Sequence, residues 1–206
     1  MSAVEEAVAA IAAGGMALVL DAADREAEGD LIMAADAADA SSLAFFLAHT
    51  SGFICCAITP ERADELALPA MTSAQEDPLR TAYLVTVDVA DAGTGISAAE
   101  RAGAARALAD PSAGPEALRR PGHLVPLRAR PGGVAERPGH TEAAVDLARL
   151  AGRAPAGVLC EVVTADKRGM ARAPELRRFA ARHALPMITI AELSAHLEER
   201  LAWARM

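Results

Sequence analysis

Apolar and polar stretches alternate along the chain, and their spacing predicts strands and helices in turn. Short apolar runs and alternating β-rich runs are typical of strands. They predict strands or extended segments at residues 16–21, 31–35, 53–58, 81–89, 123–129, 157–164 and 187–190. Helical spacing, flanked by capping residues or by glycine, predicts helices at 3–13, 41–49, 60–66, 97–110, 140–152, 173–184 and 191–203.

Two loops, 22–30 and 67–80, complete this pattern. Strands and helices that interleave indicate a sheet covered by helices. Their irregular order favours a mixed sheet over a regular doubly wound one. One domain is the simplest account of the 206 residues.

Composition narrows the classes of partner and compartment. The net charge of −8 argues against nucleic acid or an anionic membrane surface as the main partner. The three cysteines are too few and too poorly spaced for a disulfide framework or a four-ligand zinc site, and they fit a reducing compartment. The N-terminus lacks the features of a signal peptide and no apolar run is long enough to span a membrane, so we expect a cytoplasmic protein.

The chain has one lysine, Lys167, in the polar turn 164–169. A catalytic imine requires a desolvated lysine. The sequence therefore argues against an aldolase that forms an imine with a lysine.

The first candidate site is the charged stretch at residues 24–30, DREAEGD, directly after a buried strand. In α/β proteins, ligand-binding loops follow the ends of strands. Carboxylates such as Glu26 suit Mg²⁺, and Arg25 can hold a negatively charged group. An isolated acidic loop is, however, more often a solvated turn.

The second candidate site is the stretch Arg137–Glu142 at the start of a predicted helix. A helix N-terminus presents free N–H groups and partial positive charge, which favour a phosphate group. Thr141 can cap this helix and His140 can ligate a metal on the same side. The alternative is an ordinary capped helix with a surface histidine.

Two further positions carry chemistry that the pattern alone leaves open. His123 opens an extended segment and can act as acid or base, although a lone histidine more often has no such role. Glu161 lies in the apolar run GVLCEVV, where a carboxylate is costly to bury unless it is paired or catalytic. Cys55 and Cys56 must face opposite sides of one strand, so both cannot line one site.

Taken together and in this order, these stretches resemble the 3,4-dihydroxy-2-butanone 4-phosphate synthase family. The matching segments are residues 20–32, 51–59, 94–101, 120–152, 155–163 and 169–176, which include RPGH, RPGHTEA and PAGVLCE. The resemblance runs over almost the whole chain.

The resemblance implies a lyase that converts D-ribulose 5-phosphate to 3,4-dihydroxy-2-butanone 4-phosphate and formate in riboflavin biosynthesis. It implies Mg²⁺ or Mn²⁺, which stabilises an enediolate, and a homodimer. It also implies a single three-layer α/β (α+β) domain, a twisted mixed sheet with helices on both faces, over residues 1–206. The chain ends at Met206 and lacks a zinc-type cysteine cluster, so no GTP cyclohydrolase II domain is expected.

The resemblance also implies roles for individual residues. Glu26 and His140 match the metal ligands. The residues that match catalytic positions are His123, Glu161, Asp30, Glu28 and Cys55. Those that match substrate contacts are Arg25, Asp30, Thr94, Arg137, Pro138, Gly139, His140, Thr141 and Glu161. The sequence does not divide the proton transfers among them.

The sequence departs from the family pattern at several positions, and most of them lie in two loops. Ala22 and Ala23 stand where acidic residues are common, Ala27 stands where asparagine is common, and residues 71–80 lack the usual Asn-Thr pattern. These changes leave open a specialised paralogue, a metal-dependent lyase or isomerase that acts on a related sugar phosphate. A non-catalytic binding protein of the same fold is the third interpretation, and retention of the site residues argues against it.

Overall fold

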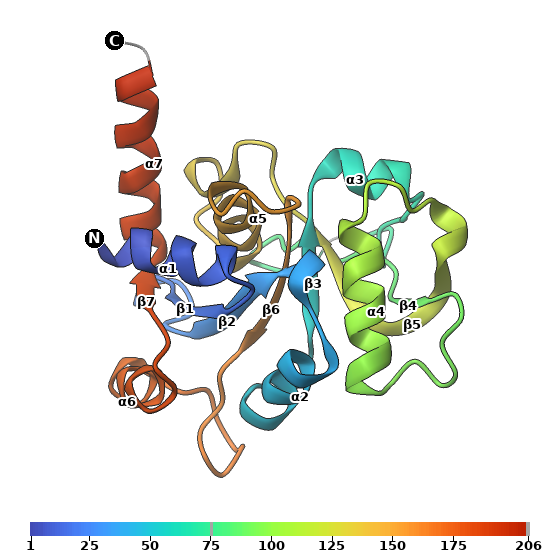
Figure 1. Ribbon diagram of the computed structural model, residues 1–206, viewed down its shortest axis with the longest axis horizontal. Helices are drawn as coiled ribbons and strands as arrows, with labels where there is room; N and C mark the ends of the chain where they lie inside the picture. The colour runs from blue at the N-terminus through green and yellow to red at the C-terminus, as the bar shows by residue number, and fades with distance from the viewer. Residues whose placement is uncertain (75, 205–206) are drawn as a thin grey trace.

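Seven strands form one mixed sheet in the computed structural model, which describes residues 1–74 and 76–204 (Figure 1). The strands are β1 (Met16–Leu20), β2 (Gly29–Ala34), β3 (Cys55–Ile58), β4 (Val87–Val89), β5 (Leu118–Arg128), β6 (Ala156–Glu161) and β7 (Met187–Thr189). Their order in the sheet is β4-β5-β3-β6-β2-β1-β7. The pairs β1–β7 and β3–β5 are parallel and the others are antiparallel, which confirms the predicted mixed sheet.

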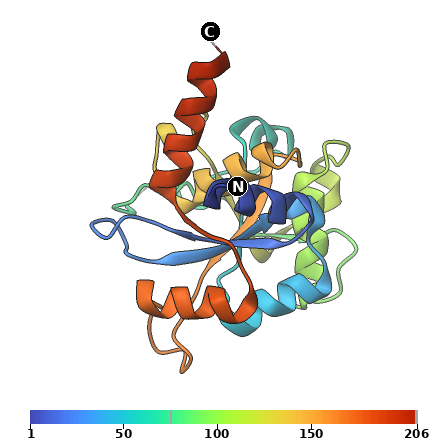
Figure 2. The same cartoon turned by 60° about the vertical axis from the view of Figure 1, so that its left-hand side comes forward.

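Helices cover both faces of this sheet (Figure 2). They are α1 (Ala3–Ala12), α2 (Ala40–His49), α3 (Pro60–Glu65), α4 (Ala98–Ala109), α5 (His140–Leu150), α6 (Ala173–His183) and α7 (Ile190–Ala204). Short 3-10 turns lie at Ala35–Ala37, Pro115–Ala117 and Gly133–Ala135. Over the described residues, no helix has the length and apolar character needed to cross a membrane.

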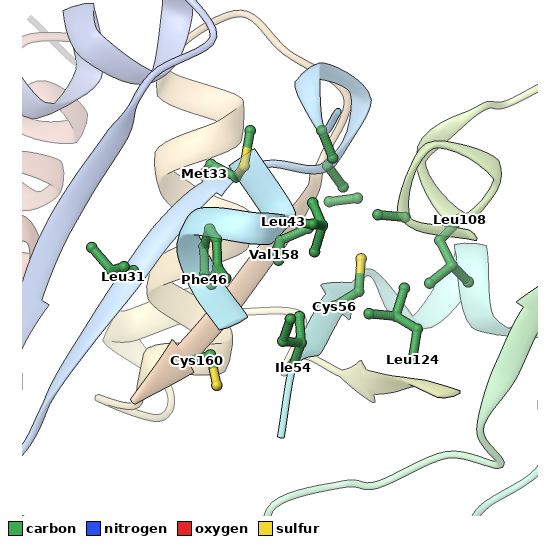
Figure 3. Packing of buried hydrophobic residues seen from close by; sticks show 14 of the residues in the cluster. Leu31, Met33, Leu43, Phe46, Ile54, Cys56, Leu108, Leu124, Val158 and Cys160 are labelled. Carbon is green, nitrogen blue, oxygen red and sulfur yellow. The ribbon is translucent and has the colours of Figure 1, made fainter. Parts of the chain in front are cut away.

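The sheet separates two hydrophobic cores, because successive side chains on a strand point to opposite faces. One core holds Ile32 and Cys55 with buried side chains of α1, α5 and α7. The other holds Leu31 and Cys56 with buried side chains of α2, α3, α4 and α6. Figure 3 shows part of this second core, where Phe46 lies among aliphatic and sulfur-containing side chains. The three-layer expectation is therefore confirmed.

The predicted strand at 81–89 is wrong in extent, because regular pairing is confined to Val87–Val89. Residues 81–86 make isolated contacts instead, among them a bridge between Tyr83 and Leu127. The neighbouring β5 carries Pro126, which accepts a bond from the N–H of Leu84 but has no N–H to return. A regular ladder is interrupted there. The loop expected at 67–80 contains a single described bridge, at Ala70, and its residue Gln75 lies outside the described residues.

Two other boundaries differ from the prediction, and both affect the site. Strand β2 begins at Gly29, so Asp30 belongs to a strand and not to the preceding loop. Strand β5 begins at Leu118, so His123 lies inside a strand and does not open one. Both side chains are consequently held by a sheet.

Candidate active site

A small pocket lies where β1 and β6 end and where β2, β3 and α5 begin. Asp30 pairs with Glu161 across β2 and β6, and Cys55 pairs with Leu159 across β3 and β6. The lining residues are Arg25, Glu26, Asp30, Cys55, Thr81, Tyr83, Leu127, Arg137, His140, Thr141, Leu159 and Glu161. The fold therefore brings together the acidic loop, the start of α5 and Glu161, which are far apart in the sequence.

The acidic loop is folded around Asp21, whose side chain is completely buried. Its carboxylate accepts hydrogen bonds from the backbone N–H of Glu28 at 2.8 Å and of Glu26 at 3.0 Å. It also accepts one from Nη1 of Arg25 at 2.9 Å, and that guanidinium contacts Glu26 as well. The loop is thus an ordered structure held by its own hydrogen bonds.

Asp21 was not among the functional residues predicted from the sequence. Its position as the last residue of a buried apolar run, directly before a charged loop, was the available signal. A carboxylate placed there can bind the N–H groups of the loop that follows.

His140 is buried at the first position of α5. Its Nε2 lies 3.1 Å from the carbonyl oxygen of Val19, so Nε2 carries the proton and donates it. Its Nδ1 faces Oδ1 of Asp30 at 3.6 Å and Oε2 of Glu26 at 3.9 Å. Burial lowers the pKa of His140 to about 4, so the ring is neutral at pH 7 and Nδ1 offers a lone pair. A ring held in this way is typical of a metal-binding histidine.

The carboxylates around His140 raise one another's affinity for protons. Burial raises the pKa of Asp30 well above its usual value, and repulsion from Glu161, Glu26, Glu28 and Asp21 raises it further. Burial likewise raises the pKa of Glu28, and it raises that of Glu26 against the opposing charge of Arg25. A cation among these groups would relieve the repulsion.

The residues present fit a divalent cation. Within the described chain, Asp21, Glu26 and His140 each offer a ligand atom, and these atoms lie within 4.8 Å of one another. In addition, the buried Oδ1 of Asp30 has no hydrogen-bond partner among the described residues. Oxygen donors with one imidazole suit Mg²⁺ or Mn²⁺.

The start of α5 forms the other wall of the pocket. Gly139 is the N-cap residue and no side chain caps the helix, so Thr141 lines the pocket without the predicted capping role. The first N–H groups of a helix have no acceptor within it and favour an anion. A Cβ atom at position 139 would overlap with Nη1 of Arg137, so a larger residue there would displace this guanidinium.

Arg137 lines the pocket, but most of its donors are already engaged. Its Nη1 donates to Oε2 of the buried Glu142 at 2.6 Å. Its Nη2 donates to the carbonyl oxygen of Leu79 at 3.0 Å and to Oγ1 of Thr81 at 3.1 Å. Arg137 therefore ties the 79–81 segment to α5 in addition to any role in binding a ligand.

The three thiols are buried and protonated at neutral pH. Burial raises the pKa of Cys55 well above its usual value, and it raises those of Cys56 and Cys160 to about 12. Cys55 lines the pocket and Cys56 lies in the opposite core, as strand alternation predicts. Cys55 is therefore a neutral wall of the pocket and not a thiolate nucleophile.

Some predicted site residues do not line this pocket. Glu28, Pro138 and Gly139 lie in its flanking segments. Thr94 is exposed in the loop before α4, and His123 on β5 contacts Asp88 of β4. The predicted site is thus divided into a pocket and a second cluster around His123.

Fold and pocket together define an α/β protein with a candidate divalent-cation site beside an anion-binding helix N-terminus. The family model for 3,4-dihydroxy-2-butanone 4-phosphate synthase matches residues 5–196. The chain belongs to this family, as the resemblance indicated.

Individual relatives agree with this assignment. The chain is 55% identical over 194 residues to a riboflavin biosynthesis protein RibBA of Salinispora arenicola, an alignment that covers 94% of this chain and 46% of that protein. It superimposes with a TM-score of 0.92, at 44% identity, on a 3,4-dihydroxy-2-butanone 4-phosphate synthase in complex with two magnesium ions. This superposition covers 97% of this chain and 98% of that one. For RibBX, a two-domain synthase from A. baumannii, the TM-score is 0.89 at 44% identity, with 93% of this chain and 56% of that one covered. The chain spans about half the length of the curated relatives it matches.

The raised pKa of Asp30 predicts how a substitution changes stability with pH. The carboxyl group of Asp30 holds its proton more tightly in the folded state than in the unfolded state, where its pKa is 3.8. Ionisation of this group above pH 4 therefore lowers the free energy of unfolding. Without divalent cations, Asp30→Asn should raise the free energy of unfolding by about 1 kcal/mol at pH 8. Well below pH 3.8, where the group is protonated in both states, the gain should vanish. Thermal unfolding in EDTA measures both values, and equal stability of the two proteins at pH 8 would contradict this account.

Proposed function

We propose that the chain converts D-ribulose 5-phosphate to 3,4-dihydroxy-2-butanone 4-phosphate and formate. Family membership supports this reaction. The observation that carries the proposal is the convergence of Glu26, Asp30, His140 and Glu161 in one pocket beside an uncapped helix N-terminus. A reaction of a phosphorylated sugar that needs a metal and proton transfer requires metal ligands, an acid or base and an anion-binding group in one pocket. Residues 1–206 would form one catalytic domain, which acts in the cytoplasm.

Glu26 and His140 would hold the cation, Mg²⁺ or Mn²⁺. When bound, such a cation supplies Lewis acidity that makes the proton next to the ketose carbonyl easier to remove. Asp21 supports this arrangement because its carboxylate accepts a hydrogen bond from the backbone N–H of Glu26 and so fixes the loop. The carbonyl group of Val19 fixes the ring of His140 with Nδ1 toward the carboxylates.

The phosphate of the substrate would bind at the start of α5. The N–H groups of the first turn and the helix dipole attract the anion there, and Thr141 and Arg137 line the same wall. Arg25 faces the pocket from the acidic loop and adds a second positive charge. Arg137 would contribute both by its charge and by holding the 79–81 segment in place.

Asp30 and Glu161 are the groups in the pocket best placed to move protons. Asp30 is buried against His140, and burial together with the neighbouring carboxylates raises its pKa, which favours its protonated form. Oε2 of Glu161 accepts a hydrogen bond from the hydroxyl of Ser51 at 2.7 Å, which leaves Oε1 to accept a proton from a substrate. Glu161 would therefore act as base and Asp30 as acid.

We also propose that the enzyme is a homodimer in which His123 of the partner subunit and Thr94 of the partner subunit complete the pocket. Both residues match site positions of the family yet lie outside the pocket of their own chain. Large apolar side chains are exposed close to both parts of the site. Phe53 is 52% exposed and its ring lies 6.3 Å from that of the pocket residue Tyr83, and Ile96, two residues from Thr94, is 49% exposed. A partner surface would cover them.

A specialised paralogue acting on a related sugar phosphate is the second candidate, because the acidic loop departs from the family pattern. Ala27 has a left-handed backbone with φ of +55°, a conformation that asparagine adopts more readily. The carbonyl oxygen of Ala27 accepts a hydrogen bond from Arg172 at 2.8 Å, which holds this conformation. The loop geometry is kept, but a polar side chain is lost.

Product analysis tests the proposed reaction. With D-ribulose 5-phosphate and Mg²⁺, NMR should detect formate and the four-carbon phosphate, and EDTA should abolish both. Glu26→Gln should lower turnover about a hundredfold or more, because a ligand is removed. The control Glu6→Gln, on the exposed face of α1, should leave turnover unchanged. Consumption of the sugar without formate would favour the paralogue, and binding without turnover would favour a non-catalytic protein.

Mixing two inactive variants tests the shared site. Glu26→Gln and His123→Ala remove groups from different chains of one pocket, so a mixed dimer keeps one intact pocket. Random exchange should restore about a quarter of the wild-type activity, because half of the dimers are mixed. The control mixture of Glu26→Gln with His140→Ala should stay inactive, since both substitutions affect the pocket of their own chain. An inactive first mixture would show that His123 does not act across the dimer.

A further inference from the structure

A second polar cluster lies around Asp88 on β4. Asp88 is buried, with 2% of its surface exposed. Its Oδ1 accepts a hydrogen bond from the backbone N–H of His123 at 2.8 Å, and Nδ1 of the imidazole lies 3.1 Å from Oδ2. A carboxylate only accepts hydrogen bonds, so Nδ1 carries the proton. The ring is thereby held through Nδ1 while 42% of the side chain of His123 stays exposed.

An irregularity in the sheet creates this contact. Val87 pairs with Leu124, but Asp88 pairs with Arg119, so residues 120–123 of β5 are set apart from the regular ladder. The carboxylate of Asp88 takes the place of a backbone acceptor for the N–H of His123. One side chain therefore fixes both the backbone and the ring of His123.

The surroundings of Asp88 also link His123 to Thr94. Nη2 of Arg119 donates to Oδ2 of Asp88 at 3.3 Å and to the carbonyl oxygen of Gly93 at 3.1 Å. Gly95, with φ of +82°, packs so closely on Asp88 that a Cβ atom there would overlap with the carboxylate. Asp88 consequently lies between His123 and the segment that carries Thr94, the two predicted site residues that are remote from the pocket.

We propose that Asp88 is a positioning residue for His123. By accepting the Nδ1 proton it fixes the tautomer in which Nε2 is unprotonated, and it fixes the direction in which Nε2 points. The inference rests on the proposed function, in which Nε2 of His123 exchanges a proton with the substrate. A carboxylate that holds a catalytic imidazole in one tautomer is an established device of enzyme active sites.

The tautomer can be read directly in the intact protein. In ¹⁵N-histidine NMR of the wild type at a pH where the ring is neutral, His123 should show a protonated Nδ1 and an unprotonated Nε2. His123→Gln assigns the signals. In Asp88→Asn the Nε2-protonated form should become populated, because an amide can donate to Nδ1 as well as accept from it. A wild-type ring protonated at Nε2 overturns the proposal, whether or not any variant folds.

Kinetics with D-ribulose 5-phosphate separate positioning from structural support. Asp88→Asn should lower kcat ten- to a hundredfold with KM changed less than about threefold, and Asp88→Glu should recover part of the loss. The matched control Asp91→Asn, on an exposed carboxylate three residues further along, should behave as the wild type. An unchanged tautomer in Asp88→Asn, or a changed tautomer with unchanged kcat, overturns the proposal. A wild type that releases no formate overturns the proposed function instead, and the NMR result still reports on Asp88.

Discussion

Repulsion among buried carboxylates is the interaction that the rest of the site has to accommodate. Asp30 is buried with four other carboxylates close enough to raise its pKa. Such a cluster costs stability unless protons or cations neutralise it. Arg25 and Arg137 line the pocket, but each already contacts a carboxylate of its own chain, and Arg172 lies 4.0 Å from Glu28. The cluster is therefore suited to a cation, and a cost in stability of this kind is common in active sites.

The surrounding structure keeps these charges in place. Asp21 binds three groups of its own loop, and His140 is fixed from behind by the carbonyl group of Val19. Asp30 and Glu161 are paired on neighbouring strands, where a sheet fixes their separation. Asp21 and His140 cannot move away without breaking a hydrogen bond to the backbone, and the sheet holds the backbones of Asp30 and Glu161 side by side. This rigidity preserves the repulsion that a cation would relieve.

Much of the fold could be predicted from the sequence, because apolar runs with clear boundaries fixed the positions of β1, β3 and all helices to within a few residues. The strand at 81–89 could not be predicted in extent, since its interruption arises from Pro126 on a neighbouring strand. Local pattern contains no information on such a partner. A sheet covered by helices followed from the order of the elements and its three layers from the family resemblance, and the mixed directions of the strands were confirmed.

The site was predictable in composition but not in geometry. Motif residues identified Glu26, His140 and Glu161, and the fold brings them together. Asp21 and Asp88 were missed because each acts by binding neighbouring groups in three dimensions, at 2.8 to 3.3 Å, and neither stands out in sequence. Arg137 was predicted only in part. Its sequence position indicated a contact with an anion, but its hydrogen bonds to Leu79 and Thr81 show that it also holds the 79–81 segment in place.

Calorimetric titration of Mg²⁺ into the metal-free protein tests the central claim most directly, namely that the crowded carboxylates form a cation site. Burial raises the pKa values of Glu26 and Glu28, so a cation that binds beside them should compete with protons. Titrations in two buffers of different ionisation enthalpy should show saturable binding with release of protons, and Glu26→Gln should abolish it. Absence of binding, or binding that is unchanged in Glu26→Gln, would contradict the account.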